Sequence, residues 1–156
     1  MNNIDDTIVS MAKLELTQRI VTLQYAVKFV CGKSAGEAVA PGFYYTAINL
    51  HNPTDRNIRF QRKIAVALPD EQGPVSSFSK EDLGPDGALE IDCKGIRKQA
   101  EIAGDFLKGF VVIKSIVELD VVAVYTVASR DQQVVAIHTE RVTPRRREFR
   151  FPKLGA

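Results

Sequence analysis

Alternation of apolar and polar side chains with a period of two runs through most of this 156-residue chain and constrains its fold more than any other feature. In the segment RIVTLQYAVKFVC every second residue is apolar or aromatic, whereas Thr22, Gln24 and Lys28 lie between them. Successive side chains of a strand point to opposite faces, so the pattern predicts a long strand over 19–31 with one buried face. NIRFQRKIAVAL follows the same rule, with Arg62 as its inward-facing exception.

Five further runs are rich in β-branched or aromatic residues and are bounded by Gly, Pro, Asn or Asp: GFYYTAINLH, GALEIDC, GFVVIKSIV, LDVVAVYTVAS and QVVAIHTERV. Residues 93–109 have helix-forming composition, but Gly95 and Gly104 keep any helix short. The segment 68–87 is rich in Pro, Gly, Ser and acids, which predicts a loop with at most a short strand around Val75–Phe78.

Seven strands at this spacing predict an all-β fold, an antiparallel β-sandwich of jelly-roll or immunoglobulin-like type with one short helix and extended termini. We divide the chain into an N-terminal arm (1–18), a β-sandwich domain (19–142) and a basic C-terminal tail (143–156).

Charge is unevenly distributed, although the net charge is only +2. Residues 69–92 carry seven acids against Lys80, a net of −6, and residues 141–156 carry six bases against Glu148, a net of +5. Two interpretations stay open. Both segments are solvated surface, or the acidic segment of one subunit meets the basic segment of another, which would make association depend on salt.

Cys31 and Cys93 are too few for a disulfide scaffold and lack the spacing of a zinc site. One disulfide stays open, but we interpret both cysteines as small buried apolar side chains. The first residues lack the basic and apolar regions of a signal peptide, and no stretch reaches about 18 apolar residues. We therefore expect no membrane span and a cytoplasmic protein, with an exported mature form left open.

Little in the chain indicates catalysis. HNPTDRN has the composition of a turn, so His51 is interpreted as the last residue of a strand. A metal site would require His51 and His138 to converge with Asp55 or Glu140. CGKSAG is not a phosphate-binding loop, because Val27 stands where that motif needs a glycine. We expect no enzymatic activity, no cofactor and no metal.

The tail TPRRREFRFPK is the most specific surface feature. Its bases could contact phosphates, but the near-neutral remainder of the chain argues against nucleic acid. Alternation of Phe149 and Phe151 around Arg150 is typical of a short edge strand that docks on a neighbouring sheet.

The leading hypothesis is a non-catalytic β-sandwich subunit that self-associates into a homo-oligomer or filament through its terminal extensions. The candidate contacts are Val21, Leu23, Tyr25, Val27, Phe29, Arg145, Arg146, Arg147, Phe149 and Phe151. The alternative that residues 19–31 are the first strand of the chain's own sandwich stays open. A second hypothesis is a binding module or signalling adaptor for a protein or small polar ligand, with Tyr44 and Tyr45 as ligand contacts.

Residues 44–130 resemble a known family. The strand, turn and strand of YTAINLHNPTDRNIRF and the paired strands of FVVIKSIVELDVVAVYTVASR resemble small bacterial β-sandwich proteins, the sensory rhodopsin transducers and their relatives. The shared positions are Asn49, Asp55, Gly73, Pro74 and the alternation through Phe110, Val112 and Val121 to Thr126. The resemblance implies a non-enzymatic, homo-oligomeric protein that works through protein contacts. The chain departs from it before residue 44, over 93–109 and in the basic tail.

Overall fold

A computed structural model describes residues 17–152 of the chain. This part is an antiparallel all-β protein with one short helix, which confirms the predicted fold class. Its elements are β1 (Thr17–Ser34), β2 (Gly42–His51), β3 (Ile58–Ala67), β4 (Gln72–Val75), β5 (Ser79–Leu83), β6 (Ala88–Asp92), α2 (Cys93–Ala100), β7 (Phe106–Ser115), β8 (Asp120–Ala128), β9 (Val134–Arg141) and β10 (Arg145–Pro152).

The seven predicted strands are all present, as β1, β2, β3, β6, β7, β8 and β9. The expectation of a loop over 68–87 was wrong, because β4 and β5 pair there with opposite ends of β3. Alternation could not reveal β4, since three of its four residues are exposed. β10 lies in the predicted basic tail.

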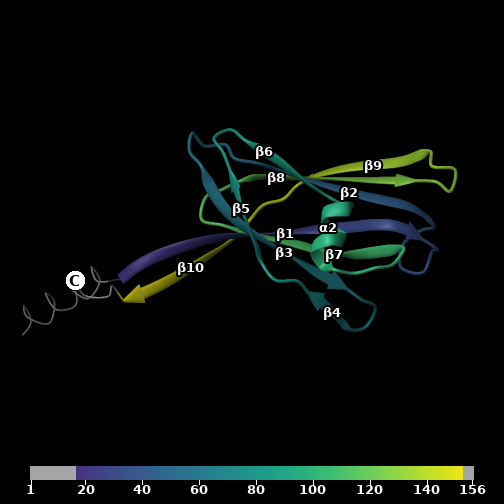
Figure 1. Cartoon of the computed structure of the whole chain (residues 1–156), viewed down its shortest axis with the longest axis horizontal. Coiled ribbons are helices and arrows are strands. Elements are labelled where there is room, and N and C mark those ends of the chain that lie inside the picture. The colour runs from purple at the N-terminus through teal and green to yellow at the C-terminus, as the bar shows by residue number, and fades with distance from the viewer. Residues whose placement is uncertain (1–16, 153–156) are drawn as a thin grey trace, which may run out of the picture.

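The strands form one continuous hydrogen-bonded sheet in the order β4-β3-β7-β1-β2-β8-β9, with β10 added to β1, β5 to β3 and β6 to β2. A sandwich of two separate sheets is therefore not confirmed. β1 and β2 share only the short pairing of Gly32–Ser34 with Gly42–Tyr44, and the sheet curls there around a single core (Figure 1). Among residues 17–152, no helix has the length and hydrophobicity needed to cross a membrane.

The inward face of β1 lies at the centre of this core. Tyr25, Val27, Phe29 and Cys31 are completely buried, as alternation predicts. This corrects the self-association hypothesis for Tyr25, Val27 and Phe29, which pack within their own chain and have no surface to offer a neighbour. Their half of β1 is instead the first strand of the chain's own core, because β7 pairs along its edge from Leu23 to Gly32.

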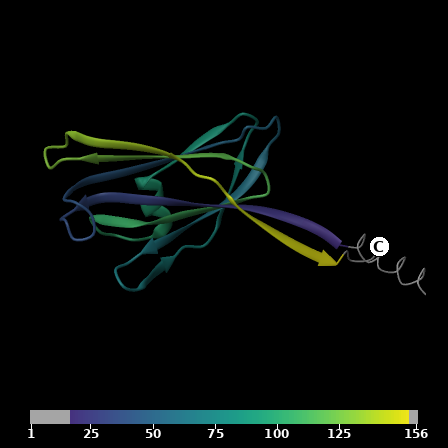
Figure 2. The ribbon, with the colours of Figure 1, turned by 180° about the vertical axis from the view of Figure 1, so that it is seen from behind.

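Beyond the core, β1 and β10 form a two-stranded ribbon, defined as Thr17–Gln24 paired with Arg145–Pro152. Both views of the molecule show this ribbon standing away from the body (Figures 1 and 2). β10 therefore docks on a strand of its own chain. Residues 1–16 of the predicted N-terminal arm lie outside the described residues.

A disulfide joins Cys31 of β1 to Cys93, the first residue of α2. This corrects the interpretation of both cysteines as unpaired apolar side chains. The helix begins where the Asp92 carboxylate accepts a hydrogen bond from the Gly95 N–H at 2.7 Å. Ile96 then enters the core with no exposed surface. The disulfide and Ile96 together fix α2 against the sheet.

Gly32 allows a close approach beside the disulfide. Its φ is +105°, and a Cβ there would lie 1.8 Å from the carbonyl oxygen of Asp105. The Arg97 guanidinium lies beside Gly32 and donates hydrogen bonds to the carbonyl oxygens of Cys31 and Asp105, both at 3.1 Å. β1 continues through this close contact as far as Ser34.

We predict that reduction of the Cys31–Cys93 disulfide lowers the free energy of unfolding by about 4 kcal/mol, because the bond closes a loop with a sequence separation of 62 in the unfolded chain. Guanidinium denaturation with and without a thiol reductant measures the difference. The matched control is the C31A/C93A variant, whose stability should not respond to the reductant. Equal stability of oxidised and reduced wild-type protein would contradict the prediction.

Candidate functional site

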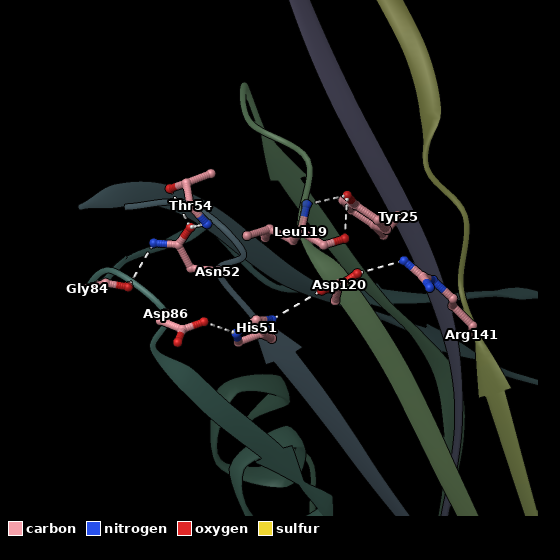
Figure 3. Close-up of polar contacts among 9 residues, drawn as sticks. All are labelled: Tyr25, His51, Asn52, Thr54, Gly84, Asp86, Leu119, Asp120 and Arg141. Carbon is pink, nitrogen blue, oxygen red and sulfur yellow. Dashed lines mark hydrogen bonds and ion pairs between the residues drawn. The ribbon is translucent and has the colours of Figure 1, made fainter. Parts of the chain in front are cut away.

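His51, the last residue of β2, lies at the centre of a polar cluster at one end of the sheet (Figure 3). Its Nε2 is 2.9 Å from Asp86 Oδ1, and its Nδ1 is 3.1 Å from Asp120 Oδ2. Asp120 is the first residue of β8 and is the register partner of His51 across the β2–β8 ladder. The sequence interpretation of His51 as a strand end is therefore confirmed, and two unforeseen carboxylates bind it.

Arg141, the last residue of β9, extends the cluster. Its Nη2 lies 2.6 Å from Asp120 Oδ1, so this one carboxylate bridges Arg141 and His51. With His51 protonated, two cations alternate with two anions and the cluster is electrically balanced. The ends of β2, β8 and β9 and the turn before β6 are thereby held together.

Asp86 reaches His51 from a tight turn. It has a φ of +54°, the left-handed conformation that Asp and Asn tolerate better than most residues. Its backbone N–H donates to the carbonyl oxygen of Thr54 at 3.1 Å, and the following Gly87 donates to Gly84 at 3.0 Å. These bonds aim the carboxylate at the histidine.

Asn52 connects the turn that carries Asp86 to the turn that follows β2. Its side chain is completely buried, and its Nδ2 lies 2.8 Å from the carbonyl oxygen of Arg56 and 2.7 Å from that of Gly84. Its Oδ1 accepts hydrogen bonds from the backbone N–H and the hydroxyl of Thr54. The HNPTDRN segment is the predicted turn, and Asn52 is its buried anchor.

The two carboxylates raise the pKa of His51 above its ordinary value, mainly through the hydrogen bond to Asp120 and then through that to Asp86. Because both ring nitrogens are engaged by carboxylates, neither is free to take a proton from a substrate. His51 is an ion-pair centre here and does not have the geometry of a general base.

Two of the other residues that a metal site would require, His138 and Asp55, lie elsewhere. His138 is on the exposed strand β9, where its ring stacks on Tyr125 at a centroid distance of 6.0 Å. Asp55 is exposed and forms no ion pair in the described part of the chain. Residues 17–152 contain no group of three or more His, Cys, Asp or Glu side chains suited to a metal ion.

Tyr44 and Tyr45, the predicted ligand contacts, line an open groove of about 320 Å³ together with Tyr125, Lys28 and Glu140. The Tyr44 hydroxyl donates to the carbonyl oxygen of Ala40 at 2.7 Å, whereas the side chain of Tyr45 is half exposed. The Tyr125 hydroxyl donates to the carbonyl oxygen of Lys28 at 3.0 Å, and burial, with Glu140 nearby, raises the pKa of Tyr125 to about 12.

Of the predicted self-association residues, several lie on the ribbon. Val21 and Leu23 are half-buried, while Arg145, Arg146, Arg147 and Phe149 are exposed along β10. The side chain of Phe151 lies outside the described residues.

Four of the seven acidic residues of the segment 69–92 form ion pairs or a helix cap within the chain. This favours the interpretation of a surface segment over that of a contact between subunits. Asp82 pairs with Arg59 at 2.8 Å and Glu81 pairs with the inward-facing Arg62. Asp86 binds His51, and Asp92 caps α2.

No family model matches the chain, and no curated protein sequence matches it. Among solved structures, the crystal structure of Thermotoga maritima 1070 is similar, with a TM-score of 0.49 and 9% sequence identity over 78% of this chain and 90% of that chain. A similarity at this level carries no argument about function. The resemblance to sensory rhodopsin transducers stays a prediction.

We predict that the His51 cluster makes stability depend on pH. The folded-state pKa of His51 is raised above the value of about 6.5 in the unfolded chain. Its stabilisation is therefore fully present below about pH 6.5, while the carboxylates remain ionised, and is lost as the pH rises through the folded-state pKa.

An NMR titration of His51 in the wild type and in D86N measures this effect. Asn keeps the backbone conformation at position 86 and removes the charge, so the pKa should fall while the Asp120 contribution remains. The unfolding free energies of the two proteins should converge at high pH. An unshifted His51 in the wild type would exclude the ion-pair cluster.

Proposed function

We propose that this chain is a non-catalytic subunit that self-associates through the β1–β10 ribbon. The observation that supports this most directly is the isolation of the ribbon. Among residues 17–152, Thr17–Thr22 pair with β10 alone, since the pairing of β1 with β7 starts at Leu23. A two-stranded ribbon is marginally stable in water without further strands or packing. A second copy of the chain can provide both.

The ribbon has the chemistry for strand addition. Over Thr17–Thr22, the edge of β1 opposite β10 pairs with no other strand among residues 17–152, so its backbone N–H and C=O groups can pair with a strand from another subunit. Ile20 and Phe149 are register partners across the ribbon and are 41% and 46% exposed. Burial of such side chains against a second ribbon removes apolar surface from water and so favours association.

β9 offers a second edge on the same subunit. All eight of its residues are exposed, including Val134, Val135 and Ile137, and in the described part of the chain it pairs with β8 alone. Exposed apolar edge strands promote pairing with other chains. A subunit with two different association surfaces can form an open filament or a closed ring, depending on whether the repeated rotation closes.

The disulfide supports an oxidising compartment as the place of action. Disulfides persist in secreted and periplasmic proteins and are rare in the reducing cytosol. The Cys31–Cys93 bond therefore favours the exported alternative over the cytoplasmic expectation.

We predict that the I20D/F149D variant is monomeric, whereas the wild-type chain is an oligomer or filament. Carboxylates at both positions oppose burial of the ribbon surface, and neither residue belongs to the core cluster. Light scattering and negative-stain electron microscopy at low and high salt measure the assembly state.

The matched control is I116D, which places a carboxylate at an apolar residue that is 70% exposed and lies outside the ribbon. It should assemble like the wild type. A wild-type chain that remains monomeric at both salt concentrations refutes self-association.

A second candidate function, a binding module for a small polar ligand, is favoured by the groove beside Tyr44 and Tyr45. Its volume of about 320 Å³ is within the range of small-molecule sites. A thermal-shift screen should show one chemical class that raises the melting temperature of the wild type. Y45A should abolish this shift, because Tyr45 lines the groove. The variant should still fold, since Tyr45 is half exposed and its side chain can be removed without opening the core. A shift that survives in Y45A would place the ligand elsewhere.

A further inference from the structure

The outward faces of β1, β3 and β7 carry four lysines, Lys28, Lys63, Lys108 and Lys114, which we call the lysine face. Alternation places these side chains opposite the core, since their neighbours Val27, Ile64, Leu107 and Ile113 are buried. β7 lies between the other two strands and pairs with both. The four ammonium groups are therefore gathered on three adjacent strands.

No carboxylate neutralises this face from within it. The outward positions of β1, β3 and β7 carry no acidic residue, and none of the four lysines forms an ion pair in the described part of the chain. Burial, followed by repulsion from Lys108, lowers the pKa of Lys28. Lys28 and Lys108 are diagonal neighbours across the β1–β7 ladder, as Lys63 and Lys114 are across the β3–β7 ladder, so their mutual repulsion is an unfavourable energy that an external anion would relieve.

Phenylalanine rings support three of the ammonium groups. Lys28 Nζ lies 5.0 Å from the centroid of Phe110, its register partner on β7. Lys63 Nζ and Lys114 Nζ lie 4.9 Å and 5.0 Å from the centroid of Phe78. Cation–π attraction at these distances holds the lysines over the sheet.

Large apolar side chains are exposed beside the same lysines. Phe78 and Phe110 are 37% and 40% exposed, and Ile116, directly after β7, is 70% exposed. Peripheral proteins bind a lipid interface through burial of apolar side chains together with attraction of basic side chains to anionic headgroups. Both elements are present on this face.

We propose that the lysine face binds the surface of a membrane that contains anionic phospholipid. A single-stranded nucleic acid fits less well, because base stacking needs open aromatic faces and lysines lie over both rings. The aliphatic Ile116 also gives a nucleic acid little to bind. A second copy of the same face is excluded by charge, since lysines would oppose lysines. The inference is independent of self-association, because the four lysines lie outside the ribbon.

Co-sedimentation of the full chain with vesicles tests the proposal. One set of vesicles contains phosphatidylcholine alone, and the other also contains phosphatidylglycerol. The wild type should bind the second set, lose binding as salt is raised, and not bind the first. K63Q/K114Q should reduce partitioning by about 25-fold, since each lysine near an anionic surface contributes about fivefold.

The matched control is K94Q/K98Q, which removes the same charge from exposed positions on α2. It should bind like the wild type, and circular dichroism should show that both variants fold. Equal binding to the two vesicle sets, or an equal loss in both double variants, overturns the proposal. Failure to bind vesicles together with binding to single-stranded DNA would also overturn it and would assign the face to nucleic acid.

Discussion

The pairing of β1 on both of its edges is the constraint on which the rest of the structure depends. This strand spans Thr17–Ser34, and three other strands pair with different parts of it. β10 pairs with its first part, β7 with the part from Leu23 onward, and β2 with its last residues. Successive parts of this one strand thus contribute to the ribbon, to the core and to the bend of the sheet.

The side-chain pattern of β1 explains how one strand can serve all three parts. From Tyr25 to Cys31 every odd-numbered residue is completely buried, so the register of this part is fixed by the core. Val21 and Leu23 are half-buried, which reflects the transition from the core to the ribbon. At Gly32 a positive φ and the absence of a side chain allow the close contact with Asp105, two residues before the strand ends at Ser34.

Alternation was sufficient to predict the strands that bury one face, because the pattern records that burial directly. It could not predict β5, most of whose side chains are not buried, whereas in the tail it indicated an edge strand only around Phe149 and Phe151, within what is β10. It also predicted too long a strand at Leu68, which is 41% exposed beyond the end of β3. The two-sheet sandwich is not confirmed, for a different reason. Whether two sheets remain joined depends on a few backbone hydrogen bonds, and these leave no mark on side-chain composition.

The partners in the His51 cluster and in the disulfide likewise could not be predicted from side-chain composition. Local composition placed His51 at the end of its strand, but its partners come from residues 35 and 69 positions away. Asp120 meets His51 because the two are register partners, and register across a long-range ladder is set by the packing of the whole strand. Cys31 and Cys93 are 62 positions apart and meet only because α2 folds back onto β1.

The polar cluster limits the functions that its end of the sheet can perform. A histidine that acts in proton transfer needs one nitrogen directed at a reacting group. His51 has carboxylates on both nitrogens, and Asp120 is shared with Arg141. Removal of Asp120 would leave Arg141 without its partner in the cluster, and would leave His51 with Asp86 alone. The cluster therefore holds strand ends together through ion pairs. The surfaces that remain open to a partner or ligand are the ribbon, the β9 edge and the lysine face.

These surfaces also affect one another, because the ribbon and the lysine face share β1. Lys28 lies only a few residues after Gln24, where the ribbon ends. Association through ribbons would join several lysine faces into one assembly. Once one face contacts an anionic surface, the others bind at a high effective concentration, so a weak contact for each subunit becomes strong for the assembly. Self-association and lipid binding would then reinforce each other without any change in the fold of the subunit.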